Sequence, residues 1–134
     1  MEYIGRHAAL AAAVDAPNVV ALNELGAAEI ITVPQGASRI ARIGVSLSAS
    51  IVAVASSGVT VEMVMTGNGI ACEQHLPCGG IREDTTSTKG AVITKPVWFD
   101  VDIGVKAGGV IDLNAYTHGV DPGTPELLFI MAFA

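Results

Sequence analysis

The sequence predicts an all-β domain, an antiparallel β-sandwich of about eight strands, and three observations support this prediction. Short apolar segments recur along the chain, and some alternate apolar with polar residues, the period of two that marks a half-buried strand. Clusters of Gly, Pro, Ser and Asp separate these segments, as turns do. Long helical patterns do not alternate with the strands, so a parallel βαβ sheet is not favoured.

The expected strands begin after Gly26. They are Glu29–Val33, Ile40–Leu47, Ile51–Ala55, Val59–Met65, Ala91–Thr94, Val97–Ile103, Val110–Thr117 and Leu127–Phe133. In the second strand, Ile43, Val45 and Leu47 alternate with small or polar residues, so we expect them to face the core. The turn Ser56-Ser57-Gly58 predicts a hairpin between the third and fourth strands. Residues 72–90, rich in Gly, Thr, Ser and charge, are expected to be mostly loop.

A short internal repeat in the sequence suggests a jelly-roll arrangement of these strands. Residues 31–36 and 103–108 share one strand-then-turn pattern, although three matching positions favour chance as its source. Two similar halves suit a jelly roll, because that sandwich is built from two Greek keys.

Residues 1–26 differ from the rest of the chain. Ala8–Val14 favours helix on propensity, but the run is short and Pro17 ends it. Because a helix of this length is marginal alone in water, we expect residues 1–26 to form an N-terminal arm, partly helical or extended. A frayed terminus is the alternative. Residues 27–134 would then form the single sandwich domain.

The composition predicts that copies of the chain bury apolar surface against one another. Hydrophobic residues make up 51% of the chain and charged residues 15%, against about 25% charged in typical globular domains. No apolar run reaches the roughly 18 residues that span a bilayer, and the polar start does not resemble a signal peptide. Because the chain has so few charges, part of its surface must be apolar. Exposed apolar patches usually mark contact sites, so we expect a homo-oligomer. The net charge of −6 argues against direct nucleic-acid binding, which needs a basic patch.

The stretch GNGIACEQHLPCGGI, residues 67–81, holds both cysteines of the chain. Cys72, His75 and Cys78 are zinc-ligand types, with His118 as the candidate fourth ligand, but the spacing is not that of a zinc knuckle or ribbon. The flanking glycines would let Cys72 and Cys78 form a disulfide across a small loop. We interpret the stretch as architecture with two free thiols, and the disulfide and the metal site are the alternatives. No cofactor is expected.

A polar row is expected on two later strands. Its members are Trp98, Asp100, Asp102, Asn114 and Tyr116. If residues 106–109 join the two strands as a hairpin, all five side chains would lie on one surface. That surface could bind calcium through hard oxygen ligands, or a sugar stacked on Trp98 or Tyr116. The simpler interpretation is a solvent-exposed sheet face or an interface rim.

The sequence does not predict a catalytic site, and we do not expect an enzyme. It contains no Gly-x-Ser-x-Gly nucleophile elbow. The glycine-rich segment Thr66–Gly69 lacks the Lys-Ser/Thr pair of a phosphate-binding loop.

Three features resemble those of the small jelly-roll structural proteins of virions. They are the strand pattern of residues 27–134, the segment Val33-Pro34-x-Gly36 leading into Arg39–Leu47, and the apolar terminal strand Leu127–Ala134. The resemblance implies a subunit of a capsid or of a capsid-attached layer, which forms a trimer or pentamer and contacts other capsid proteins. It also implies location in the virion after assembly in the host cytoplasm, with the N-terminal arm reaching onto a neighbour. A carbohydrate- or calcium-binding sandwich module and a small metal-binding protein are the alternatives.

Overall fold

The structure is a computed structural model that describes residues 1–9, 18–21, 23–24, 27–51, 58–82, 90–93, 96–120 and 123–134. Within these residues every regular element is a β-strand. The strands are β1 (Glu2–Ala9), β2 (Asn18–Ala21), β3 (Asn23–Glu24), β4 (Ala27–Thr32), β5 (Arg39–Ile51), β6 (Gly58–Thr66), β7 (Gln74–Arg82), β8 (Gly90–Ile93), β9 (Val97–Gly104), β10 (Val110–Val120) and β11 (Gly123–Phe133).

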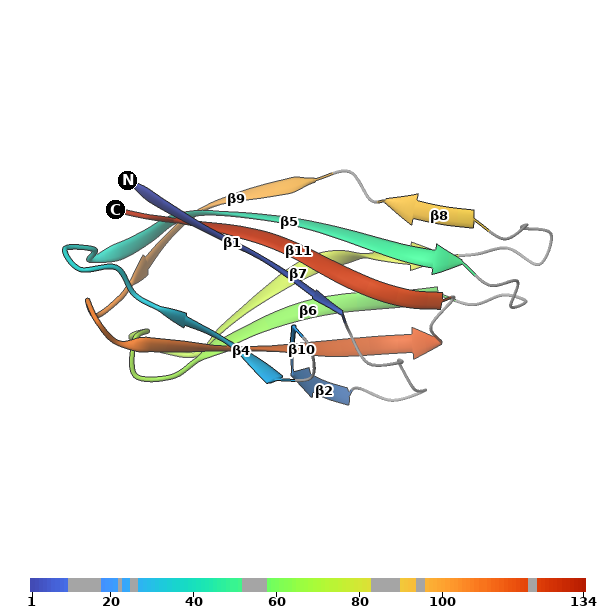
Figure 1. Ribbon diagram of the computed structural model, residues 1–134, viewed down its shortest axis with the longest axis horizontal. Helices are drawn as coiled ribbons and strands as arrows, with labels where there is room; N and C mark the ends of the chain where they lie inside the picture. The colour runs from blue at the N-terminus through green and yellow to red at the C-terminus, as the bar shows by residue number, and fades with distance from the viewer. Residues whose placement is uncertain are drawn as a thin grey trace.

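The strands form two antiparallel sheets packed as two layers (Figure 1). In one sheet the order is β1-β11-β5, and β8 and β9 both pair with the far edge of β5. In the other the order is β7-β6-β10, and β2 and β4 both pair with the far edge of β10. Each sheet therefore has four strand positions, and the short β3 links β1 to β4. These eight positions confirm the predicted antiparallel β-sandwich.

The path of the chain through these positions is that of a jelly roll. Successive positions cross from one sheet to the other, except that β6 and β7 pair within one sheet. The first and last strands lie side by side, from Glu2 opposite Phe133 to Ala9 opposite Glu126. Both chain ends therefore lie at the same end of the sandwich (Figure 1). This is the order that two Greek keys produce.

The core lies between the sheets and is built from every second residue of the strands. On β5 it contains Ile43, Val45 and Leu47, as the alternation predicts, each at most 2% exposed. Other strands of the two sheets contribute Ile31, Met63, Met65, Ile111, Leu113, Leu127, Phe129 and Met131 to the core. Burying each large apolar side chain stabilises the fold by about 1.5–3 kcal/mol, so this shared core holds the two sheets together.

The described parts of residues 1–26 belong to the sandwich and do not form a separate arm. β1 pairs with β11 at eight successive positions, and β2 pairs with β10. The sequence predicts otherwise because Gly5, Ala8 and Ala9 have low strand propensity, but pairing with a strongly apolar neighbour outweighs propensity. The rest of the expected helical run, residues 10–14, lies outside the described residues.

Two further expectations about pairing need correction. Residues 83–89 lie outside the described part, but residues 74–82, which the sequence predicts to be loop, form β7, which pairs with β6. Its Pro77 is tolerated because β7 is an edge strand, where a missing N–H leaves the ladder intact. The expected hairpin across Ser56-Ser57-Gly58 is not formed, because β5 and β6 belong to opposite sheets. Residues 52–57 themselves lie outside the described part.

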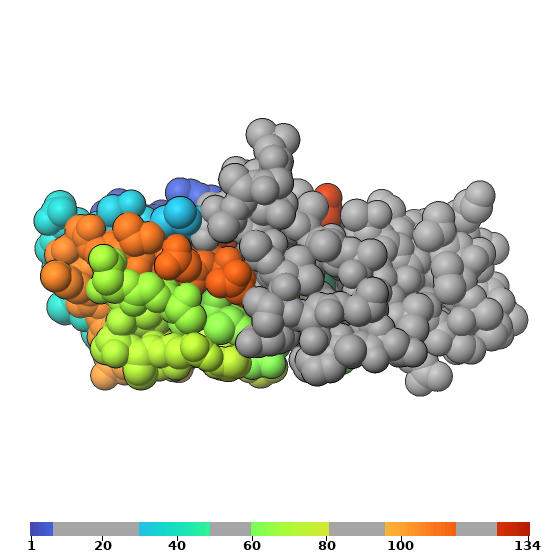
Figure 2. All heavy atoms as spheres, turned by 90° about the horizontal axis from the view of Figure 1, so that it is seen from below, coloured from blue at the N-terminus to red at the C-terminus, as the bar shows by residue number. Residues whose placement is uncertain are grey.

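Three turns close one end of the sandwich (Figure 2). They are residues 33–38, 67–73 and 105–109. Backbone hydrogen bonds join them: the N–H of Val33 donates to the carbonyl of Gly109 at 2.8 Å, and that of Lys106 donates to Gly69 at 3.0 Å. A Cβ on Gly109 would lie 2.6 Å from Cα of Gly69, so this close approach requires glycine. The glycine-rich start of the cysteine-containing stretch therefore has an architectural role.

Candidate interaction surface

The outward residues of the sheet β1-β11-β5-β9 form an apolar face. We define the apolar face by Tyr3, Gly44, Ser46, Trp98, Leu128 and Ile130. Strand register places Ile130, Gly44 and Trp98 in one row across β11, β5 and β9. Tyr3 is 59% exposed, Leu128 47% and Trp98 45%. Leu128 lies in the neighbouring row on one side of the row of Trp98, and Tyr3 lies in the neighbouring row on the other side, opposite Ala132. These apolar side chains are therefore gathered on one outer face and accessible to a partner.

The indole of Trp98 lies flat on Gly44. A Cβ at residue 44 would lie 2.9 Å from each of three atoms of the six-membered ring. These equal distances place the face of the ring, and not its edge, over the glycine. The guanidinium of Arg42 is 4.9 Å from the ring centroid, within cation–π range, and its Nε donates to Asp100 at 2.9 Å. Gly44 thus fixes the aromatic ring against the sheet, and the nearby charges are paired.

A hollow of about 360 Å³ opens on this face beside Trp98. It is lined by Gly44, Val45, Ser46, Pro96, Trp98, Leu128, Phe129 and Ile130. The hollow exists because Gly44 and Ser46 stand where larger outward side chains would otherwise fill the space. The apolar face therefore has a depression next to projecting apolar side chains.

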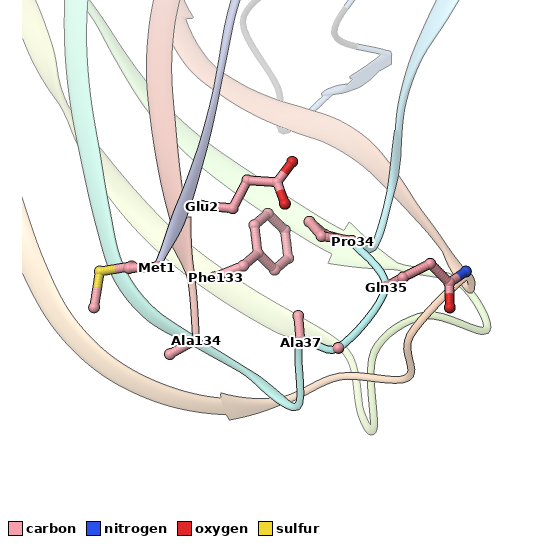
Figure 3. A pocket seen from close by; sticks show the side chains of 8 residues that line it. Met1, Glu2, Pro34, Gln35, Ala37, Phe133 and Ala134 are labelled. Carbon is pink, nitrogen blue, oxygen red and sulfur yellow. The ribbon is translucent and has the colours of Figure 1, made fainter.

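A second hollow, of about 320 Å³, lies where the two chain ends meet the turn after β4 (Figure 3). Its lining is Met1, Glu2, Pro34, Gln35, Gly36, Ala37, Phe133 and Ala134. Glu2 is the one side chain with a carboxylate among the described residues of this lining.

The outer face of the other sheet is acidic. We define the acidic face by Glu62, Glu73, His75, Asp112 and Asn114. Nδ1 of His75 contacts Glu62, and Nε2 lies 2.5 Å from Oε1 of Glu73. Only the imidazolium carries an N–H on both ring nitrogens. Hydrogen bonds to Glu73 and then Glu62 therefore raise the pKa of His75 above its ordinary value of 6.5.

The two cysteines are free thiols in different environments. Cys72 is exposed in the turn before β7, and its Sγ accepts a hydrogen bond from Gln74 at 2.9 Å. Cys78 is the extra residue of a β-bulge and points into the core, where burial raises the pKa of its thiol to about 11. The disulfide alternative is therefore not formed, because the bulge turns one sulfur inward and leaves the other at the surface.

The candidate metal ligands Cys72, His75, Cys78 and His118 are not brought together. β6 pairs Val64 with His75 and Thr60 with His118, so the two histidine backbones are separated by about 13 Å along β6 and lie on either side of it. Only the backbone of His118 is described. Among the described side chains, no group of three His, Cys, Asp or Glu residues is arranged to hold a metal ion.

The polar row is split between the two sheets. The expected hairpin is not formed, because β9 pairs with β5 and β10 pairs with β6. The three β9 residues therefore lie on the sheet of the apolar face, and Asn114 lies on the acidic face. Asp102 pairs with Arg39 at 3.4 Å. The backbone of Tyr116 lies opposite Glu62, and its side chain is outside the description.

Sequence reasoning singled out only Trp98 among the residues of the apolar face. A signal for Leu128 and Ile130 is present in Leu127–Phe133, where they are apolar as well as the buried Leu127 and Phe129. A strand with one solvent face alternates apolar and polar residues, so a strand that is apolar on both faces indicates contact on its outer side.

No protein-family model matches the chain, and no curated protein matches it either. In the part of the chain that the structure describes, no helix has the length and apolar character needed to cross a membrane.

Proposed function

We propose that the chain is a structural subunit that assembles with copies of itself, as a component of a capsid or of a capsid-attached layer. The observation that supports this most is the apolar face, with three large apolar side chains each 45% or more exposed on one sheet. Exposed apolar side chains gathered on one face in this way mark protein contacts. A second copy covering them would remove apolar area from water at roughly 25 cal/mol per Å².

The fold and the charge content agree with this proposal. A jelly roll presents two broad outer sheet faces, and structural shells are one of its uses. Only 15% of the residues are charged, so closely packed copies have few unpaired charges to bury. Assembly proceeds through a trimer or pentamer that tiles further, alone or with other capsid proteins, in a virion formed in the host cytoplasm.

Electron microscopy of the purified chain tests the proposal. We expect rings, shells or sheets at micromolar concentration, and sedimentation velocity should show species several times heavier than the chain. A monomer that stays monomeric at every concentration up to its solubility limit would contradict self-assembly.

Glycan binding is a second candidate function, favoured by the exposed Trp98 ring that Gly44 fixes against the sheet. Sugars stack on such fixed aromatic rings. Calorimetry with a glycan panel, on the wild type and on Trp98→Ala, separates the two functions. Heat of binding that disappears in Trp98→Ala supports glycan binding, and the absence of heat with every glycan contradicts it.

A further inference from the structure

The apolar face carries both a projection and a depression. Leu128 and Trp98 are about half exposed, and the hollow of about 360 Å³ lies between and beside them. In a two-fold interface the same patch is used on both subunits, so that patch must be complementary to itself. A surface with a projection next to a depression meets this requirement, because each copy can fill the hollow of the other.

The charges at the border of the apolar face are also complementary to themselves. Arg42 and Asp100 lie side by side at 2.9 Å, so a two-fold axis that passes between them would place each arginine near the aspartate of the other copy. On the acidic face, the described side chains include three carboxylates, Glu62, Glu73 and Asp112, and a single basic group, His75, so pairing this face with itself brings an excess of like charge together. Like charges across an interface are repulsive, so the acidic face is unsuited to pairing with itself.

Pairing of an apolar face with an acidic face is also disfavoured. Carboxylates lose hydration against an apolar surface and gain no new hydrogen-bond donor there, and burying charge in an apolar contact is unfavourable. A second copy is therefore best accommodated when it presents its own apolar face.

We propose that a second copy of this chain binds the apolar face with its own apolar face, around a two-fold axis. This inference rests on the proposed self-assembly and assigns one of its contacts. A specific interface of standard size removes about 800 Å² from each partner, which is about an eighth of the 6805 Å² that the chain exposes. The contact joins rings of subunits into a larger layer.

Sedimentation velocity on two matched variants tests the proposal. Leu128→Glu introduces a charge on the apolar face, and Ile30→Glu introduces the same charge at a residue of similar exposure, 50% against 47%, on the other sheet. Because a two-fold axis places residue 128 in the interface twice, we expect Leu128→Glu to weaken pairing about a hundredfold or more. Ile30→Glu should pair as the wild type does.

Cross-linking keeps the test decisive if Leu128→Glu fails to fold. In a Cys72→Ser background, Ser46→Cys on the apolar face should give disulfide-linked dimers under mild oxidation. The matched Thr66→Cys, outward on the other sheet, should not.

The outcomes separate the two proposals. If the wild type remains monomeric at every concentration, both are overturned. If it assembles, but the two glutamate variants behave alike and Ser46→Cys does not cross-link, the two-fold contact is overturned and self-assembly stands. Selective loss of pairing in Leu128→Glu, or selective cross-linking of Ser46→Cys, supports the contact.

Discussion

The two outer faces of the sandwich follow one geometric rule and have opposite chemistry. On both, every second residue of a strand turns away from the core, which places Leu128 and Trp98 on one side and Glu62 and Asp112 on the other. The core needs only the inward residues to be apolar, so the fold itself does not require this difference. Among the described side chains, three large apolar ones are at least 45% exposed on the apolar face, against Ile30 on the other face, so the apolar face is the better candidate for contact.

The largest expected effect compares the two sides of β11. Phe129→Ala removes a fully buried ring and should lower the free energy of unfolding by about 3–5 kcal/mol. Leu128→Ala, one residue earlier and facing out, should change it by about 0.5 kcal/mol or less in the monomer. Urea denaturation at low protein concentration measures both values. Equal losses would show that the outward position is as buried as the inward one.

The next effect concerns the thiols of Cys72, in the turn before β7, and Cys78, within β7. A pKa of about 11 instead of 9.0 reduces the thiolate fraction of Cys78 about a hundredfold at pH 8. We expect an alkylating reagent to modify Cys72 quickly, and Cys78 at least about a hundred times more slowly than in denaturant. Mass spectrometry of digested samples separates the two sites. Rapid modification of both in the folded protein would contradict the inward position of Cys78.

A smaller effect is expected where Trp98 meets the apolar face. Gly44→Ala places a methyl 2.9 Å from the ring, which must shift, so we expect a loss of about 1–2 kcal/mol and a changed fluorescence spectrum. Gly5→Ala is the matched control, because its Cβ would first meet a flexible atom of Ile130 at 3.4 Å. That variant should unfold within about 0.5 kcal/mol of the wild type. A spectrum unaltered by Gly44→Ala would show that the ring does not rest on residue 44.

The smallest effect is the pH dependence of the acidic face. The pKa of His75 is raised in the folded state, so its contribution to stability is complete below 6.5 and is lost as pH rises through the folded-state pKa. Thermal unfolding should therefore occur at a higher temperature at pH 6 than at pH 8.5, and His75→Gln should reduce that difference. An unchanged pH profile in the variant would contradict the contacts with Glu62 and Glu73.

The part of the fold that sequence predicts well is local. The alternation of Ile43, Val45 and Leu47 reports directly which side of β5 is buried. The strands that sequence misses contain Gly5 in β1, or Pro77 and Gly79 in β7, where low propensity is outweighed by pairing with an apolar neighbour. The choice of partner is non-local, which is why two expected hairpins are absent.

The candidate surface could be predicted only in part for the same reason. Trp98 is recognisable as an exposed aromatic residue on an alternating strand. Its neighbours Leu128 and Ile130 are distant in sequence and reach it only through the register of β11 with β5 and β9. In a run as apolar as Leu127–Phe133, the sequence shows no contrast between the two faces.

The sole tryptophan of the chain, Trp98, lies on the surface that assembly should cover. Its fluorescence, recorded from nanomolar to high micromolar concentration with acrylamide as quencher, tests that claim most directly. We expect the emission maximum to move to shorter wavelength and quenching to weaken as concentration rises, because a second copy excludes water from the ring. A spectrum and a quenching constant that stay the same over the whole range would contradict a contact at the apolar face.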